Sequence, residues 1–209
     1  MSSSNLIRWG GLAAMLAGAS FVAADLLSLS ISPKFPSSVS LLSEPYAIQS
    51  VLKLIGAALL LLGLFGLHAR QTEAAGPLGT AGFLAAFSGT ALAVGSFWAT
   101  AFFAPAMAAM DPVAFDAGQG PPGRLADAFV VTMTAFVLGW MLFGVAAWRA
   151  RVYPRAAALL LIFGSPLALG TLLVVGFPTG VFFSAAVAWL GYTLWSEKCV
   201  PVGQPARVS

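Results

Sequence analysis

The most constraining feature of this 209-residue chain is a stretch of 41 residues, 156–196, without one charged side chain. As a single helix it would measure about 60 Å at 1.5 Å per residue, twice the thickness of the hydrocarbon core of a bilayer. The sequence Gly-Phe-Pro-Thr-Gly at 176–180 lies at its middle and favours a turn. The stretch therefore predicts two membrane spans joined by a tight connection.

The composition of the whole chain also indicates a membrane protein. It is 59% hydrophobic and 8% charged, with a mean hydropathy of +0.92, whereas soluble domains carry about 25% charged residues. The net charge of +3 does not indicate nucleic-acid binding, because the basic residues are dispersed between apolar runs. One cysteine, Cys199, and one histidine, His68, exclude an internal disulfide, a cysteine-built metal site and a bis-histidine haem, so no cofactor is expected.

Apolar runs of about 20 residues, the length of a membrane span, recur along the chain. We expect spans at about 6–31, 47–68, 77–103, 126–148, 155–175 and 178–196, in a single domain over 1–196, and a cytoplasmic tail at 197–209. The segments 33–45 and 105–125 read as polar loops, the second with a short interfacial helix near 106–110. The first run exceeds the usual 7–15 apolar residues of a signal peptide, so an uncleaved span is expected.

The fold class predicted is therefore all-α, a polytopic membrane protein with six transmembrane helices. Six spans place both termini on one side of the membrane. Seven basic residues fall on that side and three on the other, and the positive-inside rule then places both termini in the cytoplasm. The seven are Arg8, Arg70, Arg149, Arg151, Arg155, Lys198 and Arg207, and the three are Lys34, Lys53 and Arg124. A five-span topology would break this charge pattern.

The expected spans contain a weak internal repeat. The even spans end in similar sequences at 62–70, 139–149 and 190–198, and the odd spans open with small residues at 11–14, 82–86 and 156–159. This pattern predicts three like-oriented hairpins, a parallel repeat. The alternative is that helices rich in Leu, Ala and Gly resemble one another by composition alone.

Two charges lie inside the first two expected spans. Asp25 and Lys53 are each about six residues from the outer end of their span, hence at similar depth. A charge at the bilayer centre costs about 2.5–3.5 kcal/mol on insertion scales and less near the interface. Lys53 can reach outward with its long side chain, but Asp25 needs a partner or water. We expect the two charges to face each other near the outer surface.

Three interpretations of these charges stay open at the level of sequence. They could form a structural ion pair, form a polar site at the base of an outward-facing cavity, or reach water independently. In the second interpretation Lys53 binds an anionic group or Asp25 exchanges a proton. The candidate ligand-binding residues are those expected at the same level, namely Asp25, Lys53, Gln49, Trp98, Thr100 and Asp127.

The segments 70–77, 101–112 and 140–154, and the chain as a whole, resemble small multi-pass membrane proteins of unknown function from high-GC bacteria such as actinobacteria. This resemblance implies a location in the bacterial cytoplasmic membrane. Its motifs are compositional, so it implies no functional residue.

The leading functional hypothesis is binding or transport of a small or amphipathic molecule, a lipid included, at the outward-facing polar site. A transporter of this length is expected to act as a dimer. The alternative is a non-catalytic membrane subunit or scaffold that packs on a partner or on itself. Intramembrane catalysis is disfavoured, because no serine has a plausible histidine partner within the expected spans.

Overall fold

A computed structural model describes residues 3–31, 37–117, 123–173 and 179–196, and every regular element in these ranges is a helix. This confirms the all-α prediction. The expected tail at 197–209 and most of the expected turn at 176–180 lie outside the described residues. The elements are α1 (Ser3–Ser28), α2 (Ser38–Leu41), α3 (Glu44–Trp98), the π-helix η1 (Ala99–Phe103), α4 (Ala104–Met110), α5 (Pro112–Asp116), α6 (Gly123–Ala150), α7 (Arg155–Leu173) and α8 (Val181–Ser196).

Three helical stretches in the described residues are long and apolar enough to cross a membrane. They are Asn5–Ser28, Glu44–Met110 and Asp127–Ala150, while Arg155–Ala168 and Val181–Ser196 are apolar but shorter. Large apolar side chains, among them Trp9, Leu62, Leu138 and Phe163, are more than half exposed on the outside of the bundle. Apolar helices with this surface indicate a membrane-embedded protein.

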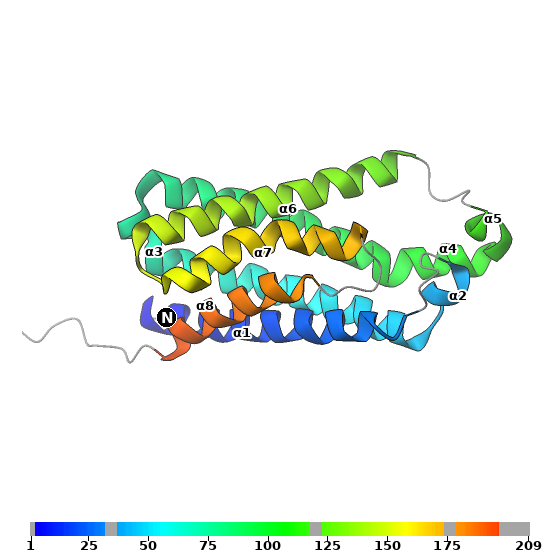
Figure 1. Ribbon diagram of the computed structural model, residues 1–209, viewed down its shortest axis with the longest axis horizontal. Coiled ribbons are helices and arrows are strands. Elements are labelled where there is room, and N and C mark those ends of the chain that lie inside the picture. Colours follow the sequence, from blue (N-terminus) through cyan, green and yellow to red (C-terminus); the bar gives the residue numbers. More distant parts are fainter. Residues whose placement is uncertain (1–2, 32–36, 118–122, 174–178, 197–209) are drawn as a thin grey trace, which may run out of the picture.

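Helix α3 reverses its direction at Gly76. This glycine has φ 55° and ψ −147°, a backbone conformation that glycine adopts without a steric penalty. Ring contacts then join residues at similar distances on either side of it: Phe65 lies 5.6 Å from Phe87, and His68 stacks on Phe83 at 4.2 Å between centroids. The two halves of α3 therefore form an antiparallel helical hairpin (Figure 1), with its turn between the two predicted spans.

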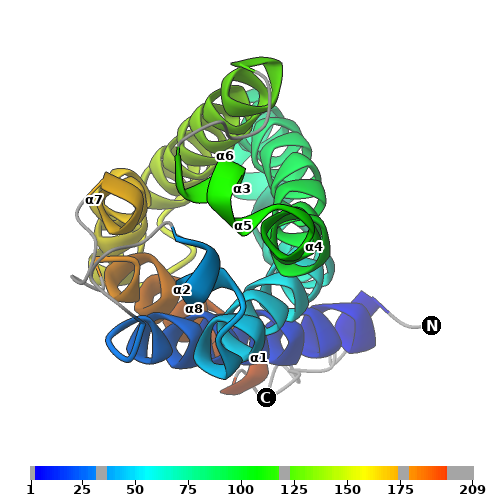
Figure 2. The same cartoon turned by 90° about the vertical axis from the view of Figure 1, so that its right-hand side faces the viewer.

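The helices are arranged as a ring (Figure 2). Helix α1 packs against α3 and α8, α3 packs against α6, and α7 lies between α6 and α8. Small residues bring neighbouring backbones together, as expected where lipid gives helices no hydrophobic reason to associate. A Cβ on Gly63 of α3 would lie 2.9 Å from the Cα of Ala14 in α1.

Aromatic side chains fill the middle of the bundle. The ring of Phe183 in α8 lies 6.4 Å from Phe21, 5.3 Å from Phe136 and 5.4 Å from Trp140 between centroids. The indole Nε1 of Trp140 donates a hydrogen bond to Oγ1 of Thr90 at 2.9 Å, so its one polar atom is paired inside the core. Helices α1, α3, α6 and α8 thus share one packed core.

The segment after α3 is more helical than the predicted polar loop at 105–125, and α4 contains the short helix that was predicted near 106–110. It continues as η1 and α4, and α5 follows after Asp111. Pro105 has no backbone N–H to direct at the carbonyl of Ala101, which favours a local departure from α-helical bonding at the position of η1. The hydroxyl of Tyr46, at the start of α3, donates to the carbonyl of Thr100 at 3.1 Å and ties this segment to the other half of the hairpin.

Asp116 joins the two segments at this end of the bundle, opposite the N-terminus (Figure 1). Its Oδ1 accepts the backbone N–H of Ser38 and its Oδ2 accepts the Ser38 hydroxyl, both at 2.7 Å. Leu41, Tyr46 and Ala108 form a small buried cluster beside them. The predicted loops are therefore docked on each other as a cap of short helices, a contact that the sequence did not suggest.

The bonds to Ser38 hold the pKa of the Asp116 carboxyl below its ordinary value of 3.8. A carboxyl whose pKa is lower in the folded state stabilises that state above the unfolded pKa, and the contribution is lost as the pH falls through the folded value. We expect the amide of Ser38 to be protected from hydrogen exchange above pH 3.8 and to lose protection below it, after correction for intrinsic rates. Asp116→Ala should remove the protection at every pH; unchanged protection in that variant would contradict the contact.

The approach of α3 to α6 gives a second prediction. A Cβ on Gly139 would lie 2.5 Å from the carbonyl oxygen of Ala85, whereas one on Gly95 would meet nothing within 4 Å. Gly139→Ala should lower the stability by about 1–3 kcal/mol through overpacking, and Gly95→Ala should raise it by about 0.5–1 kcal/mol through the lower backbone entropy of alanine. Thermal unfolding in detergent measures both; equal midpoints would contradict the helix contact.

Candidate functional site

Asp25 is a buried charge near the end of α1. It is 5% exposed and lies one helical turn beyond Phe21, on the face of α1 that enters the core. A carboxylate withdrawn from water needs a charged partner or hydrogen bonds to offset its lost hydration. The side chains and backbone around Asp25 therefore define what this part of the molecule can do.

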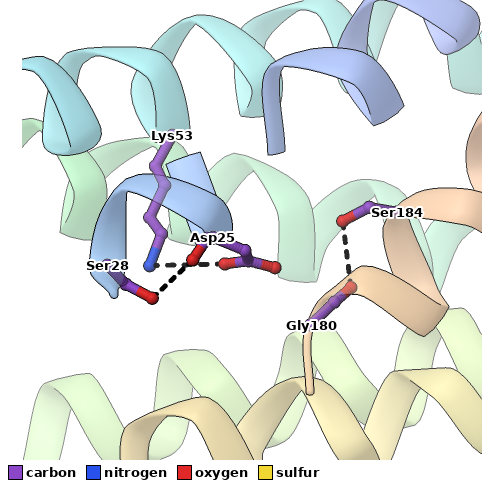
Figure 3. Close-up of polar contacts among 5 residues, drawn as sticks. All are labelled: Asp25, Ser28, Lys53, Gly180 and Ser184. Carbon is purple, nitrogen blue, oxygen red and sulfur yellow. Dashed lines mark hydrogen bonds and ion pairs between the residues drawn. The ribbon is translucent and has the colours of Figure 1, made fainter. Parts of the chain in front are cut away.

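The first partner of Asp25 is Lys53 of α3. The Lys53 Nζ lies 3.9 Å from the Asp25 Oδ1 (Figure 3), which confirms that the two charges face each other. The separation is longer than the 2.7–3.2 Å of a hydrogen bond. The Lys53 side chain is 25% exposed and that of Asp25 7%. The pair is thus asymmetric, with a buried carboxylate and a lysine side chain that is partly exposed.

The second partner is the start of α8. The Oδ2 of Asp25 lies so close to Gly180 that a Cβ there would collide with it. Gly180 immediately precedes α8, and its carbonyl accepts the Ser184 hydroxyl at 2.9 Å within the first turn (Figure 3). A helix N-terminus carries a partial positive charge that favours a carboxylate by about 0.3–1 kcal/mol, and up to about 2 kcal/mol in partly buried sites. Asp25 therefore connects three helices.

Gly180 was not among the predicted site residues. It is 155 positions from Asp25 in the sequence, and its role depends on α8 packing beside α1. A signal was nevertheless present: Gly180 ends the predicted turn before the last span, and glycine at such a position permits close approach. Ser28 adds local support, because its hydroxyl donates to the backbone carbonyl of Asp25.

The other predicted site residues do not form a single cluster with this pair. Gln49 is buried on α3, one turn from Lys53. The hydroxyl of Thr100 donates to the carbonyl of Phe97 within its own segment. Trp98 is 56% exposed and Asp127 is exposed. A ligand-binding role for these four residues stays a prediction.

The side chains at the site determine which ligands it could bind. Within the described residues no cluster of three or more His, Cys, Asp or Glu side chains could hold a metal ion. Comparisons with known protein families, curated proteins and solved structures found no match. What the site does must therefore be inferred from its geometry, which offers a buried carboxylate beside a partly exposed lysine side chain.

The close contact of Asp25 with Gly180 predicts a strong effect from one methyl group. Gly180→Ala should destabilise the protein by about 1–3 kcal/mol, since either the carboxylate or the start of α8 must move. In an Asp25→Ala background the same substitution should cost much less, because the colliding oxygen is gone. Thermal unfolding of the four proteins in detergent tests this; additive effects would show that the two residues are not in contact.

Proposed function

We propose that this protein spans the bacterial cytoplasmic membrane six times, with both termini in the cytoplasm and three like-oriented hairpins. The two halves of the α3 hairpin count as two spans. The start of α1 and the end of α8 lie together, with the Arg8 guanidinium 5.1 Å from the centre of the Trp195 ring. The junction of α6 and α7 lies at the same end of the bundle (Figure 1), with Arg149 near the end of α6, Arg151 between the two helices and Arg155 at the start of α7. This distribution of basic residues supports a cytoplasmic location for that end.

In this orientation the protein binds an amphipathic anion at Lys53, on the outer side. The observation that carries the proposal is the asymmetry of the pair: Asp25 is buried against the start of α8, while the Lys53 side chain is 25% exposed and its Nζ lies 3.9 Å from the carboxylate. An ammonium group has three hydrogen-bond donors. Lys53 can therefore donate to a phosphate or carboxylate without leaving Asp25.

The surroundings of the pair favour a ligand with an apolar part. Leu26, the residue after Asp25 on α1, is 55% exposed, and Leu29, directly after the end of α1, is 56% exposed. An anionic group at Lys53 would therefore lie beside apolar surface. The chemistry that fits is a lipid or lipid-like molecule with one negative head group, and Asp25 then orients Lys53 rather than contacting the ligand.

A second candidate function is a non-catalytic subunit or scaffold that packs on a partner or on another copy. The packed aromatic core and the position of Asp25 between three helices favour it, because an ion pair that only fixes helix positions needs no ligand. The two functions differ in whether Lys53 contacts anything besides this chain.

Native mass spectrometry separates them. Protein released from nanodiscs with equal amounts of dioleoylphosphatidylglycerol and dioleoylphosphatidylcholine should retain at least one phosphatidylglycerol. Lys53→Met should lose that lipid, since the cation that holds its phosphate is removed. Arg149→Gln, which removes an exposed cation at the other end of the bundle, should retain it.

Asp25→Asn sharpens the comparison. This substitution removes the negative charge of Asp25 but keeps the ammonium group of Lys53. Phosphatidylglycerol should therefore stay bound to Asp25→Asn at temperatures at which the variants are folded. If Lys53→Met retains phosphatidylglycerol as the unchanged protein does, the binding function is wrong and the scaffold function is favoured.

A further inference from the structure

Gln71 of α3 is a buried polar side chain away from the Asp25 site. It is 0% exposed, and neither its Nε2 nor its Oε1 has a hydrogen-bond partner among the described residues. Buried polar groups are nearly always paired with protein or with ordered water. Leaving an amide unpaired in an apolar environment destabilises the folded state. Two unpaired atoms on one buried amide therefore point to a bound group.

The face of α3 that leads to Gln71 is apolar. Leu60, Leu64 and Leu67 precede it on the same face of α3 and are also 0% exposed. The hydroxyl of Tyr153 donates to the carbonyl of Leu67, one turn before Gln71, at 2.7 Å. In an α-helix that carbonyl also accepts the backbone N–H of Gln71. The connection from α6 to α7 therefore covers the turn that carries the amide.

We propose that the Gln71 side chain binds a small neutral molecule that both donates and accepts hydrogen bonds, in the simplest case one water molecule, enclosed at this end of the bundle. An anion would satisfy only Nε2 and a cation only Oε1, whereas water satisfies both. Buried waters typically make about three hydrogen bonds to otherwise unpaired polar groups. His68 also leaves Nδ1 unpaired, but its ring is stacked on Phe83, and it is not part of the proposed site.

Radiolytic labelling tests this inference, because hydroxyl radicals formed from an enclosed water modify the side chains that touch it. Full-length protein in detergent micelles is irradiated with microsecond X-ray pulses in ¹⁸O-labelled water. Leu67 should be labelled severalfold faster than Leu60 and Leu64, which are leucines of equal burial on the same helix face. Equal labelling of the three leucines would overturn the proposal.

Gln71→Leu provides the second measurement. It should reduce the labelling of Leu67 to that of Leu60 and should not raise the unfolding midpoint, since the hydrogen bonds to water are lost with the amide. If the site is empty, the same substitution removes two unpaired polar atoms and raises the midpoint. A raised midpoint, or labelling of Leu67 that persists in this variant, overturns the proposal. Gln71→Met serves in the same way if the leucine variant does not fold.

Discussion

One buried carboxylate constrains the arrangement of the helices. The Asp25 side chain is only 7% exposed, and positive charge approaches it from two directions: the Lys53 ammonium group of α3 and the N-terminal turn of α8 at Gly180. The favourable interactions hold only if α1 lies between α3 and α8 in one register. A displacement of either neighbour by a helical turn, about 5.4 Å, would leave the carboxylate buried without a partner.

The packing of the core is consistent with the register that the charges require. Phe21 lies one turn before Asp25 and Phe183 three residues after Gly180, and their rings are 6.4 Å apart. Further along, a Cβ on Gly18 would meet the Ser184 carbonyl oxygen of α8 at 2.6 Å. Electrostatic pairing and close packing therefore favour the same position of α1 on α8, and disturbing one should weaken the other.

Local sequence patterns predicted the helices better than the contacts between distant segments. Apolar runs about 20 residues long predicted the helices, and matching depth predicted the contact of Asp25 with Lys53. The roles of Gly180 and Asp116 depend on which segments pack together, and α-helical periodicity carries no such information. Within the predicted loop at 105–125, the described residues 105–110, 112–116 and 123–125 are helical. The prediction missed most of these helices because it gave the prolines and aspartates more weight than the apolar residues.

A double-mutant cycle between Asp25 and Lys53 tests the central claim most directly. The free energy of unfolding in detergent is measured for the unchanged protein, Asp25→Ala, Lys53→Ala and the double variant. If the carboxylate depends on Lys53, the two substitutions are coupled by at least about 0.5 kcal/mol. Lys53→Ala then lowers the free energy of unfolding less in the Asp25→Ala variant than in the unchanged protein. Additive effects would contradict the claim that this ion pair helps to hold the bundle together.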